Sequence, residues 1–323
     1  MPVARILFVL PLPEPFDYAV PEGMDVRVGS YVTAPLGQTE RLGVVWDLLG
    51  EDAAAGRELK PVLSVHDVPP MPTAMREFIS WAAKYTVSHP GHVLGMTLRA
   101  RGGLLPSPTE TVFHLTGEVP GKLTDARRRV LDAAEEVGAA NAATLAAAAG
   151  VSSGVVKGLV SAGALRAEEM AADAPFAVPQ PDLPGADLTG EQAAAADALK
   201  AAMRAGGFAA FLLDGVTGSG KTEVYFEAIA EALRVDPDAQ VMVLLPEIAL
   251  TQAILSRFEE RFGAAPAPWH SGLSDKERRR TWRETAHGRA RIVIGARSAL
   301  FLPYANLKLI IVDEEHDGSY KQE

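Results

Sequence analysis

The residues of this chain best suited to chemistry lie in the stretch 215–222, which reads GVTGSGKT and is called the phosphate loop below. It is a complete G-x-x-x-x-G-K-[ST] pattern, whose glycines let the backbone turn its N–H groups toward a polyphosphate. Lys221 would reach the β- and γ-phosphates, and the Thr222 hydroxyl would bind Mg²⁺. A glycine-rich turn can match by chance, but the flanking sequence favours phosphate binding. The residues expected at the phosphates are Gly215, Gly218, Ser219, Gly220, Lys221 and Thr222.

A second chemical group follows the apolar run 309–312. At the carboxyl end of a strand, Asp313 can hold Mg²⁺ or its water shell, and Glu314 can accept a proton from water that attacks a γ-phosphate. Acidic residues after a strand are also common in turns. Their position downstream of a phosphate loop favours nucleotide hydrolysis, with Lys221, Asp313 and Glu314 as the catalytic residues.

A third candidate is the triplet Phe16-Asp17-Tyr18. Two aromatic rings around a carboxylate on a turn could stack on a base and accept hydrogen bonds from its edge. Taken alone, the spacing favours ordinary core aromatics next to a turn aspartate.

The elements around the phosphate loop alternate between strand and helix. The apolar run 208–213 predicts a strand before the loop, and 221–233 predicts a helix after it. Further strands are expected at 240–245, 266–269, 291–294 and 307–312, with helices at 249–262 and 274–287, and Thr189 is expected to cap a helix through Ala202. This alternation predicts a parallel sheet with helices on both faces over residues 188–323, and the apolar run 307–312 is expected to be a buried strand.

The remaining sequence predicts two more domains and a linker. Residues 1–104 are rich in strand signals at 3–10, 29–35, 41–46 and 61–65, which predict a small barrel or curled sheet. A helix is expected at 73–85, with Phe78, Ile79 and Trp81 on or near its buried face. Residues 105–172 predict three short helices followed by a strand, the pattern of a winged helix. The proline-rich segment 173–187 reads as a linker. The expected fold class is therefore multidomain α/β.

The third helix of the central domain, 152–161, occupies the recognition position of a helix-turn-helix. It carries only Lys157 as a basic residue, so we expect no sequence-specific reading of bases. A role in packing and a role in contacting the DNA backbone remain equally open.

Composition narrows the class of protein. The 323 residues are 48% hydrophobic and 22% charged, which is typical of a soluble globular chain of two or three domains. There is no cysteine, which excludes disulfides and thiolate zinc sites from these residues. No apolar run reaches about 20 residues, so a cytoplasmic location without a membrane partner is expected. The net charge of −10 argues against bulk attraction to nucleic acid, so any DNA contact must use local basic strips such as 127–129 and 276–280.

Four stretches together carry a family resemblance: GVTGSGKTEVY (215–225), PEIALT (246–251), GARSALF (295–301) and DEEHDGSYKQ (313–322). They resemble motifs I, Ia, Ib and II of superfamily 2 helicases, and in their wording they resemble the replication-restart helicases of the PriA (primosomal protein N′) family. The resemblance covers the whole chain. It implies a β-rich 3′-end DNA-binding domain, a winged helix and the first RecA-like helicase lobe.

The resemblance also implies an activity and partners. It implies a helicase that uses ATP and Mg²⁺, moves 3′ to 5′, recognises stalled or abandoned replication forks and starts primosome assembly in the nucleoid. Its DNA partners would be forks, D-loops and 3′ ends, and its protein partners would be single-stranded DNA-binding protein and other primosome proteins.

Several residue roles follow from the resemblance alone. Gln192 would read the adenine, and Glu315 and His316 would complete the DEEH box on the nucleotide side, with His316 coupling nucleotide state to DNA. The triplet at 16–18 would form a pocket for a 3′-terminal nucleotide, with Asp17 bonding the base edge. The residues implied at DNA are Phe16, Asp17, Tyr18, Gly37, Lys60, Thr251, Arg297 and Ser298.

The family continues beyond the DEEH region with a second RecA-like lobe, a cysteine-rich zinc module and a C-terminal domain. Zinc is therefore expected only in that further region, and the isolated chain is expected to bind DNA and nucleotide without unwinding. One alternative is a non-enzymatic fork-binding scaffold with a vestigial ATPase. Another is a winged-helix transcription regulator fused to a phosphate-loop switch.

Overall fold

The structure is a computed structural model that describes residues 2–50, 53, 57–118, 120–121, 123–171, 173, 175–216, 218–246 and 249–320. The chain forms two compact units, one of Met1–Leu105 with Pro175–Glu323 and one of Pro106–Ala174. Five motif residues expected from the sequence lie outside the described residues: Thr217, Glu247, Ile248, Lys321 and Gln322. The finer division into domains stays a prediction.

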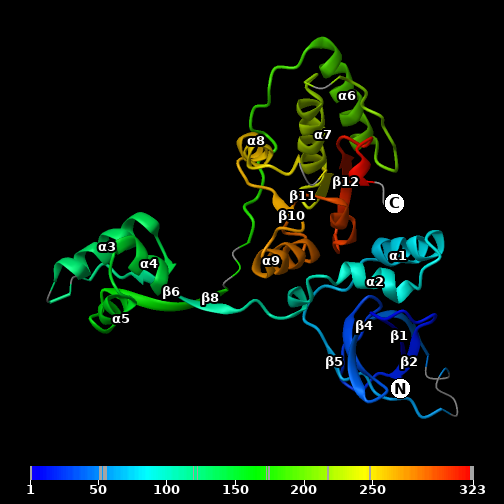
Figure 1. Cartoon of the computed structure of the whole chain (residues 1–323), viewed down its shortest axis with the longest axis horizontal. Coiled ribbons are helices and arrows are strands. Elements are labelled where there is room, and N and C mark those ends of the chain that lie inside the picture. The colour runs from blue at the N-terminus through cyan, green and yellow to red at the C-terminus, as the bar shows by residue number, and fades with distance from the viewer. Residues whose placement is uncertain are drawn as a thin grey trace. The chain divides into compact units, whose positions relative to one another are not determined.

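The first unit begins with a five-stranded antiparallel sheet in the order β2-β1-β4-β3-β5, which curls on itself in Figure 1. Its inner face buries an apolar cluster that includes Ile6, Phe8 and Tyr18, because alternate residues of each strand point inward. Gly37 turns the β3–β4 hairpin with a φ of 63°. The strands are β1 (Val3–Phe8), β2 (Phe16–Ala19), β3 (Tyr31–Leu36), β4 (Thr39–Leu49) and β5 (Ser64–Val65).

Two helices follow this sheet, α1 (Thr73–Tyr85) and α2 (Pro90–Thr97). The bounds of α1 agree with the sequence prediction, and of the three apolar residues expected on or near its buried face, Ile79 is fully buried. Met75, Ile79, Ala82 and Ala83 form the buried face, so the Trp81 ring lies beside that face and is 58% exposed. It stacks on the rings of two neighbours along the helix, Phe78 and Tyr85.

The second part of the first unit is a parallel sheet in the order β10-β11-β9-β12. Figure 1 shows it with helices packed around it, and this confirms the predicted α/β class. The apolar strand β9 lies inside the sheet and is completely buried, as expected for a strand covered on both faces. The elements are α6 (Gly190–Ala205), α7 (Lys221–Val235), β9 (Gln240–Leu244), α8 (Gln252–Phe262), β10 (Ala267–Trp269), α9 (Asp275–Ala286), β11 (Ile292–Gly295) and β12 (Leu307–Val312).

The strand predicted at 208–213 is not present in the structure. This segment is extended but has no strand pairing among the described residues, and Phe208 is 97% and Leu212 83% exposed. Strand β12 is likewise less buried than its apolar sequence predicts, because within the described part of the chain β9 is its one partner strand and its other edge is unpaired. An apolar run forms a strand only where a partner satisfies its backbone hydrogen bonds.

The two parts of this unit share one hydrophobic core around Trp282 of α9, which is fully buried. The Trp282 ring packs edge-on against Tyr31 of β3, and its Nε1 donates to the Thr97 carbonyl at 2.8 Å. A Cβ at Gly103 would lie 2.4 Å from the Trp282 ring, so this close approach requires glycine.

The second unit contains three helices and a small antiparallel sheet in the order β7-β6-β8. The helices and the final strand were predicted, whereas β6 and β7 were not. Lys157 of α5 is exposed. The elements are β6 (Thr109–Leu115), α3 (Asp125–Val137), β7 (Ala140–Asn141), α4 (Ala142–Ala149), α5 (Ser153–Ser161) and β8 (Leu165–Ala171).

Among the described residues, no single helix is long and apolar enough to cross a membrane, and only α4 with α5, bent by 111°, passes as a pair by length and composition.

Candidate functional site

The phosphate loop has the backbone shape that its glycines permit. Gly218 and Gly220 adopt φ values of 80° and 83°, a region that side-chain-bearing residues rarely enter. Gly220 caps the start of α7, so the helix N-terminus opens at the loop. A Cβ would lie 2.7 Å from the Ser219 hydroxyl if added at Gly215 and 2.4 Å from the Gln192 amide if added at Gly220. The loop is therefore closely packed at both ends.

Gln192 lies against the phosphate loop because the start of α6 holds it there. Its side-chain oxygen accepts from the Thr189 backbone N–H at 2.8 Å in a capping box. Its Nε2 donates to the Ser219 carbonyl at 2.8 Å. Both ends of the amide are thus bonded to the protein, and Gln192 ties α6 to the loop.

One cavity of about 610 Å³ brings the two main motifs together. It is lined by Gly215 and Lys221 of the phosphate loop and by Asp313 to His316 after β12. The Lys221 Nζ donates to the Gly215 carbonyl at 2.6 Å, inside its own loop. A phosphate oxygen would offer this ammonium group a stronger, charged acceptor. The remaining expected residues, Gln192, Gly218, Ser219, Gly220 and Thr222, lie outside the lining of the cavity.

A tyrosine that the sequence reasoning missed connects the two motifs. The Tyr225 hydroxyl donates to Asp313 Oδ2 at 3.3 Å and also bonds the Thr222 side chain. Burial and the nearby Asp313 charge raise the pKa of Tyr225, so it stays a neutral donor. Tyr225 follows Lys221 and Thr222 by one helical turn, and this spacing was the available signal.

The same residues fit a magnesium ion chemically. Thr222 and Asp313 present a hydroxyl and a carboxylate to one tyrosine hydroxyl, and oxygen atoms are the ligands that Mg²⁺ prefers. The Tyr320 hydroxyl donates to the Asp313 carbonyl at 3.0 Å and supports the turn that carries the acid. Burial raises the pKa of Tyr320 to about 12, so this donor is also retained at neutral pH.

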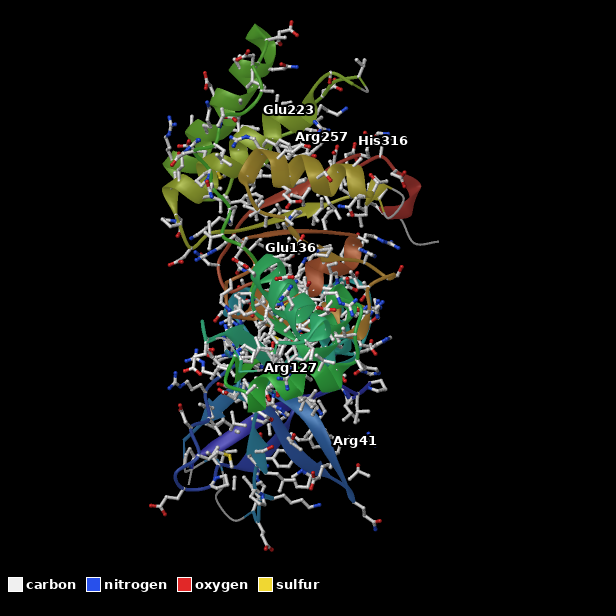
Figure 2. All side chains as sticks on the ribbon, turned by 90° about the vertical axis from the view of Figure 1, so that its left-hand side faces the viewer. Arg41, Arg127, Glu136, Glu223, Arg257 and His316 are labelled. Atoms are coloured by element: carbon white, nitrogen blue, oxygen red, sulfur yellow. The ribbon has the colours of Figure 1, made fainter. Side chains whose placement is uncertain are left out.

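The turn after β12 holds Glu314 in a rare backbone conformation with a φ of 50°. Its carboxylate lies 3.4 Å from His316 Nε2, and His316 is largely exposed. Figure 2 labels His316 on this segment and also Glu223 and Arg257, whose 2.6 Å ion pair joins the first turn of α7 to α8. The first turn of α7 is therefore held from outside the cavity, since neither Glu223 nor Arg257 belongs to its lining.

The structure places Asp17 between two arginines that the sequence reasoning missed. Asp17 Oδ1 accepts from Arg5 Nε at 3.0 Å, and Oδ2 accepts from Arg57 Nη2 at 3.1 Å. The hydrogen bond from Arg5, aided by Arg57, holds the pKa of Asp17 below its usual range. Two other residues expected at the 3′-end pocket are bonded to each other: Lys60 Nζ donates to the Gly37 carbonyl at 3.2 Å.

The two aromatic residues beside Asp17, Phe16 and Tyr18, differ in how far their rings are exposed. All three residues lie on strand β2 and not on a turn, so Asp17 points to the face opposite Phe16 and Tyr18. Tyr18 is 4% exposed and its hydroxyl donates to the Pro35 carbonyl at 2.8 Å, whereas Phe16 is 41% exposed. Phe16 is therefore the ring of the triplet with surface left for stacking.

The remaining expected DNA contacts lie along the helicase sheet. Thr251 precedes α8 with an exposed side chain, and no cap bond from its hydroxyl occurs in the described part of the chain. Arg297 and Ser298 line a second cavity, of about 510 Å³, which also contains Arg99 and Arg278. Arg278 belongs to the basic strip 276–280 that the sequence singled out, whereas Arg99 was missed because it lies in no motif or basic strip.

Two family models match the chain: a 3′DNA-binding domain (3′BD) over residues 5–99 and a DEAD/DEAH box helicase over residues 191–323. The second match implies the use of ATP and Mg²⁺. Both matches agree with the class of fold in the corresponding regions.

Curated relatives extend the similarity to the whole chain. The replication restart protein PriA of Haemophilus influenzae is 32% identical over 346 residues, which cover 100% of this chain and 45% of the relative. That of Chlamydia pneumoniae is 33% identical and covers 95% of this chain and 42% of the relative. That of Bacillus subtilis is 48% identical over 136 residues, 42% of this chain and 17% of the relative. The chain thus spans less than half the length of these relatives, and it belongs to the PriA family of replication restart proteins.

Proposed function

We propose that this chain is the nucleotide-binding and fork-recognising part of an ATP-dependent DNA helicase that moves 3′ to 5′. Its substrates would be stalled or abandoned forks and D-loops, and it would start primosome assembly there with single-stranded DNA-binding protein. The observation that carries the proposal is the shared cavity of Lys221, Asp313 and Glu314. Their side chains can contact, in turn, the phosphates, the metal ion and the attacking water of phosphoryl transfer.

Each residue would have one task in this reaction. ATP with Mg²⁺ would supply the transferable γ-phosphoryl group and the positive charge that neutralises it. Lys221 would exchange the Gly215 carbonyl for phosphate oxygens, while the oxygens of Thr222 and Asp313 would hold the metal. Glu314 would orient the attacking water and take its proton.

One charge that such a reaction needs is not supplied by this cavity. Among the described residues that line it, Lys221 is the one permanent cation, and no arginine takes part. An arginine at the transferred phosphoryl group is worth about 10³ to 10⁵ in rate. We therefore infer that residues 1–323 by themselves bind nucleotide and forked DNA without unwinding it.

The first test uses the longest form of the protein and measures DNA-stimulated ATP hydrolysis. Lys221→Ala is expected to abolish the stimulated rate while DNA binding is retained, because this lysine would contact the phosphates of ATP and not those of DNA. Lys308→Ala is the matched control, since this lysine on β12 is about half exposed and only 3.7 Å from Asp236 in a surface ion pair.

Two results would contradict the proposal. Stimulated hydrolysis that survives Lys221→Ala would mean that the chain is a fork-binding scaffold whose ATPase site is vestigial. Robust strand separation by residues 1–323 alone would show that no further charge is required at the cavity.

A further inference from the structure

The segment between the second unit and helix α6 is bonded to the helicase part of the chain along its length. We call residues 175–188 the strap, and Figure 1 shows it passing α8 before α6 begins. Its backbone carbonyls accept from arginines of α9, α7 and α8: Pro175 from Arg280, Pro181 from Arg234, and Leu183 from Arg261. The strap therefore has a fixed course over three helices, and it leads directly into Thr189, which caps α6.

Arg261 is the buried member of these three arginines. Its side chain is 5% exposed, its Nη1 donates to the Leu183 carbonyl at 2.8 Å, and its Nη2 donates to Glu227 Oε1 of α7 at 2.9 Å. A Cβ at Gly185 would lie 2.8 Å from Glu227 Oε1 and 3.2 Å from Arg261 Nε, so the strap packs directly on this ion pair. Arg261 therefore joins the strap to the helix that begins at the phosphate loop.

Helix α6 has little packing of its own to fix its position. Ala196 is the one residue of α6 that is fully buried in the described part of the chain. At the C-terminal end of the helix, Arg204 pairs with Glu231 of α7 at 2.6 Å. The N-terminal end is reached through the strap, so the course of the strap determines where that end lies.

The N-terminal end of α6 carries the residue expected at adenine. Gln192 belongs to the Thr189 capping box, and its Nε2 donates to the Ser219 carbonyl of the phosphate loop at 2.8 Å. Of the three arginines, Arg261 holds the strap closest to Thr189, at Leu183. Release of the strap by Arg261 therefore loosens the chain that leads into this capping box.

We propose that Arg261 is a positioning residue for ATP, because it fixes Gln192 relative to the phosphate loop. The adenine side of the site is held through the strap, and the phosphate side is held through Glu227 and α7. An arginine suits this task because its rigid fork can bond two acceptors in fixed directions, whereas a lysine offers one point of charge. This inference rests on the proposed function, since it requires that Gln192 bind the adenine of ATP.

The test uses the longest form of the protein and measures DNA-stimulated hydrolysis of ATP and of GTP. Arg261→Lys keeps the charge but not the fork between Leu183 and Glu227. It is expected to raise the KM for ATP about tenfold, the effect of one lost pair of bonds to a base. The kcat should stay nearly unchanged, because Lys221 and Glu314 are untouched. The KM for GTP should change by less than about twofold, since guanine has an oxygen where adenine has an amino group.

A double substitution shows whether Arg261 acts through Gln192. Gln192→Ala alone is expected to raise the KM for ATP. In the Gln192→Ala background, Arg261→Lys is then expected to change the KM for ATP by less than about twofold, because the contact that it positions is already gone. If the effects of the two substitutions multiply instead, the arginine acts independently of Gln192 and the inference is wrong.

A second variant loosens the strap and leaves Arg261 in place. The added Cβ of Gly185→Ala must displace either the strap or the Glu227 carboxylate. We expect a higher KM for ATP with the same kcat, so this variant carries the test if Arg261→Lys lowers the melting temperature. Arg289→Lys is the matched control: Arg289 also bonds a buried acid, Glu284, at 2.8 and 2.5 Å, but it makes no bond to the strap among the described residues.

The outcomes separate this inference from the proposed function. A wild-type protein that does not hydrolyse ATP overturns both. An active wild-type protein whose KM for ATP is the same in Arg261→Lys and Gly185→Ala overturns the inference alone. Equal rises in the KM for ATP and for GTP, or a fall in kcat without a change in KM, also overturn it. A rise confined to the KM for ATP, absent in Arg289→Lys and in the Gln192→Ala background, supports it.

Discussion

At Asp17 the residue that the family resemblance assigns to a DNA base is already bonded to its own protein. Arg5 and Arg57 hold its two carboxylate oxygens, and the Asp17 side chain is 13% exposed. Lys221 is in the same situation, because its ammonium group is bonded to the Gly215 carbonyl. Each carboxylate oxygen can accept more than one hydrogen bond, so a base could share Asp17 without displacing both arginines. A phosphate, in contrast, must replace the bond that Lys221 makes.

The Asp17 ion pairs predict a pH dependence of stability. Because the folded-state pKa of Asp17 is lowered, its contribution is present above the unfolded value near pH 4 and is lost as pH falls through the folded value. Asp17→Asn is expected to lower the free energy of unfolding by about 0.5–1 kcal/mol at neutral pH, since the arginine partners are exposed. Urea denaturation at neutral pH and at about pH 3 measures the difference, which should shrink at the lower pH.

The same variant also tests recognition of the 3′ end. Asp17→Asn is expected to weaken binding of DNA with a free 3′ end but not of DNA with a blocked one. Asp25→Asn is the matched control, because Asp25 also pairs with an arginine, Arg27 at 2.7 Å, but is 72% exposed. Equal binding of both DNAs by wild type and Asp17→Asn would exclude Asp17 from the 3′ pocket.

At the scale of elements, the open edge of β12 and the extended segment 208–213 face the same cavity. Both are apolar in sequence, and both are partly exposed in the structure. The strand–loop–helix arrangement predicted around the phosphate loop is therefore half present, with helix α7 formed and the strand before the loop unpaired. The first strand of such a motif is stabilised by neighbours in the sheet and not by its own sequence.

The difference in burial between segment 208–213 and the buried strand β9 can be tested by substituting one leucine in each. Leu212→Ala is expected to change the free energy of unfolding by less than about 0.5 kcal/mol, because Leu212 is 83% exposed. Leu244→Ala in β9 is expected to cost about 2–5 kcal/mol, since this leucine is 3% exposed and leaves a cavity. Urea denaturation of residues 1–323 gives both values. A cost for Leu212→Ala as large as that for Leu244→Ala would show that 208–213 is a buried strand in solution.

At the scale of the whole molecule, residues 2–105 and 175–320 share one core although the sequence predicts separate domains for them. Trp282 connects them, through the Tyr31 ring and the Thr97 carbonyl. Arg283 on the same helix adds a 2.9 Å bond to the Leu105 carbonyl. Such contacts couple the stability of the curled sheet to that of the parallel sheet.

Two tryptophans test this coupling. Trp282→Ala is expected to lower the free energy of unfolding by about 3–5 kcal/mol, because the ring is fully buried and its N–H is bonded. Trp81→Ala, the matched control, should cost about 1 kcal/mol or less, since that ring is 58% exposed. The measurement is urea denaturation followed by far-ultraviolet circular dichroism. Similar costs for the two substitutions would mean that the shared core does not form in solution.

Much of the local structure could be predicted from the sequence. Helix α1 begins and ends at the predicted residues, Thr189 caps α6 as predicted, and the helix predicted at 274–287 is present as α9. The phosphate loop and Asp313 could also be predicted, because glycine conformations and the end of an apolar run are encoded in adjacent residues. The ion pairs of Arg5 and Arg57 with Asp17 and the bond from Tyr225 to Asp313 could not be predicted in this way, because these partners lie 12 to 88 positions apart along the chain.

The sequence by itself determined the chemistry of this protein: a phosphate loop, an acidic pair after an apolar run, and sequence motifs that resemble those of a helicase family. Those features depend on residue type and on spacing of a few positions, which short-range backbone geometry fixes. Only the tertiary structure decided which groups meet. It placed Lys221 and Asp313 in one cavity, bonded Asp17 to two arginines, and left 208–213 unpaired. The physical reason is that burial and sheet pairing depend on neighbours from distant parts of the chain, and no local pattern records them.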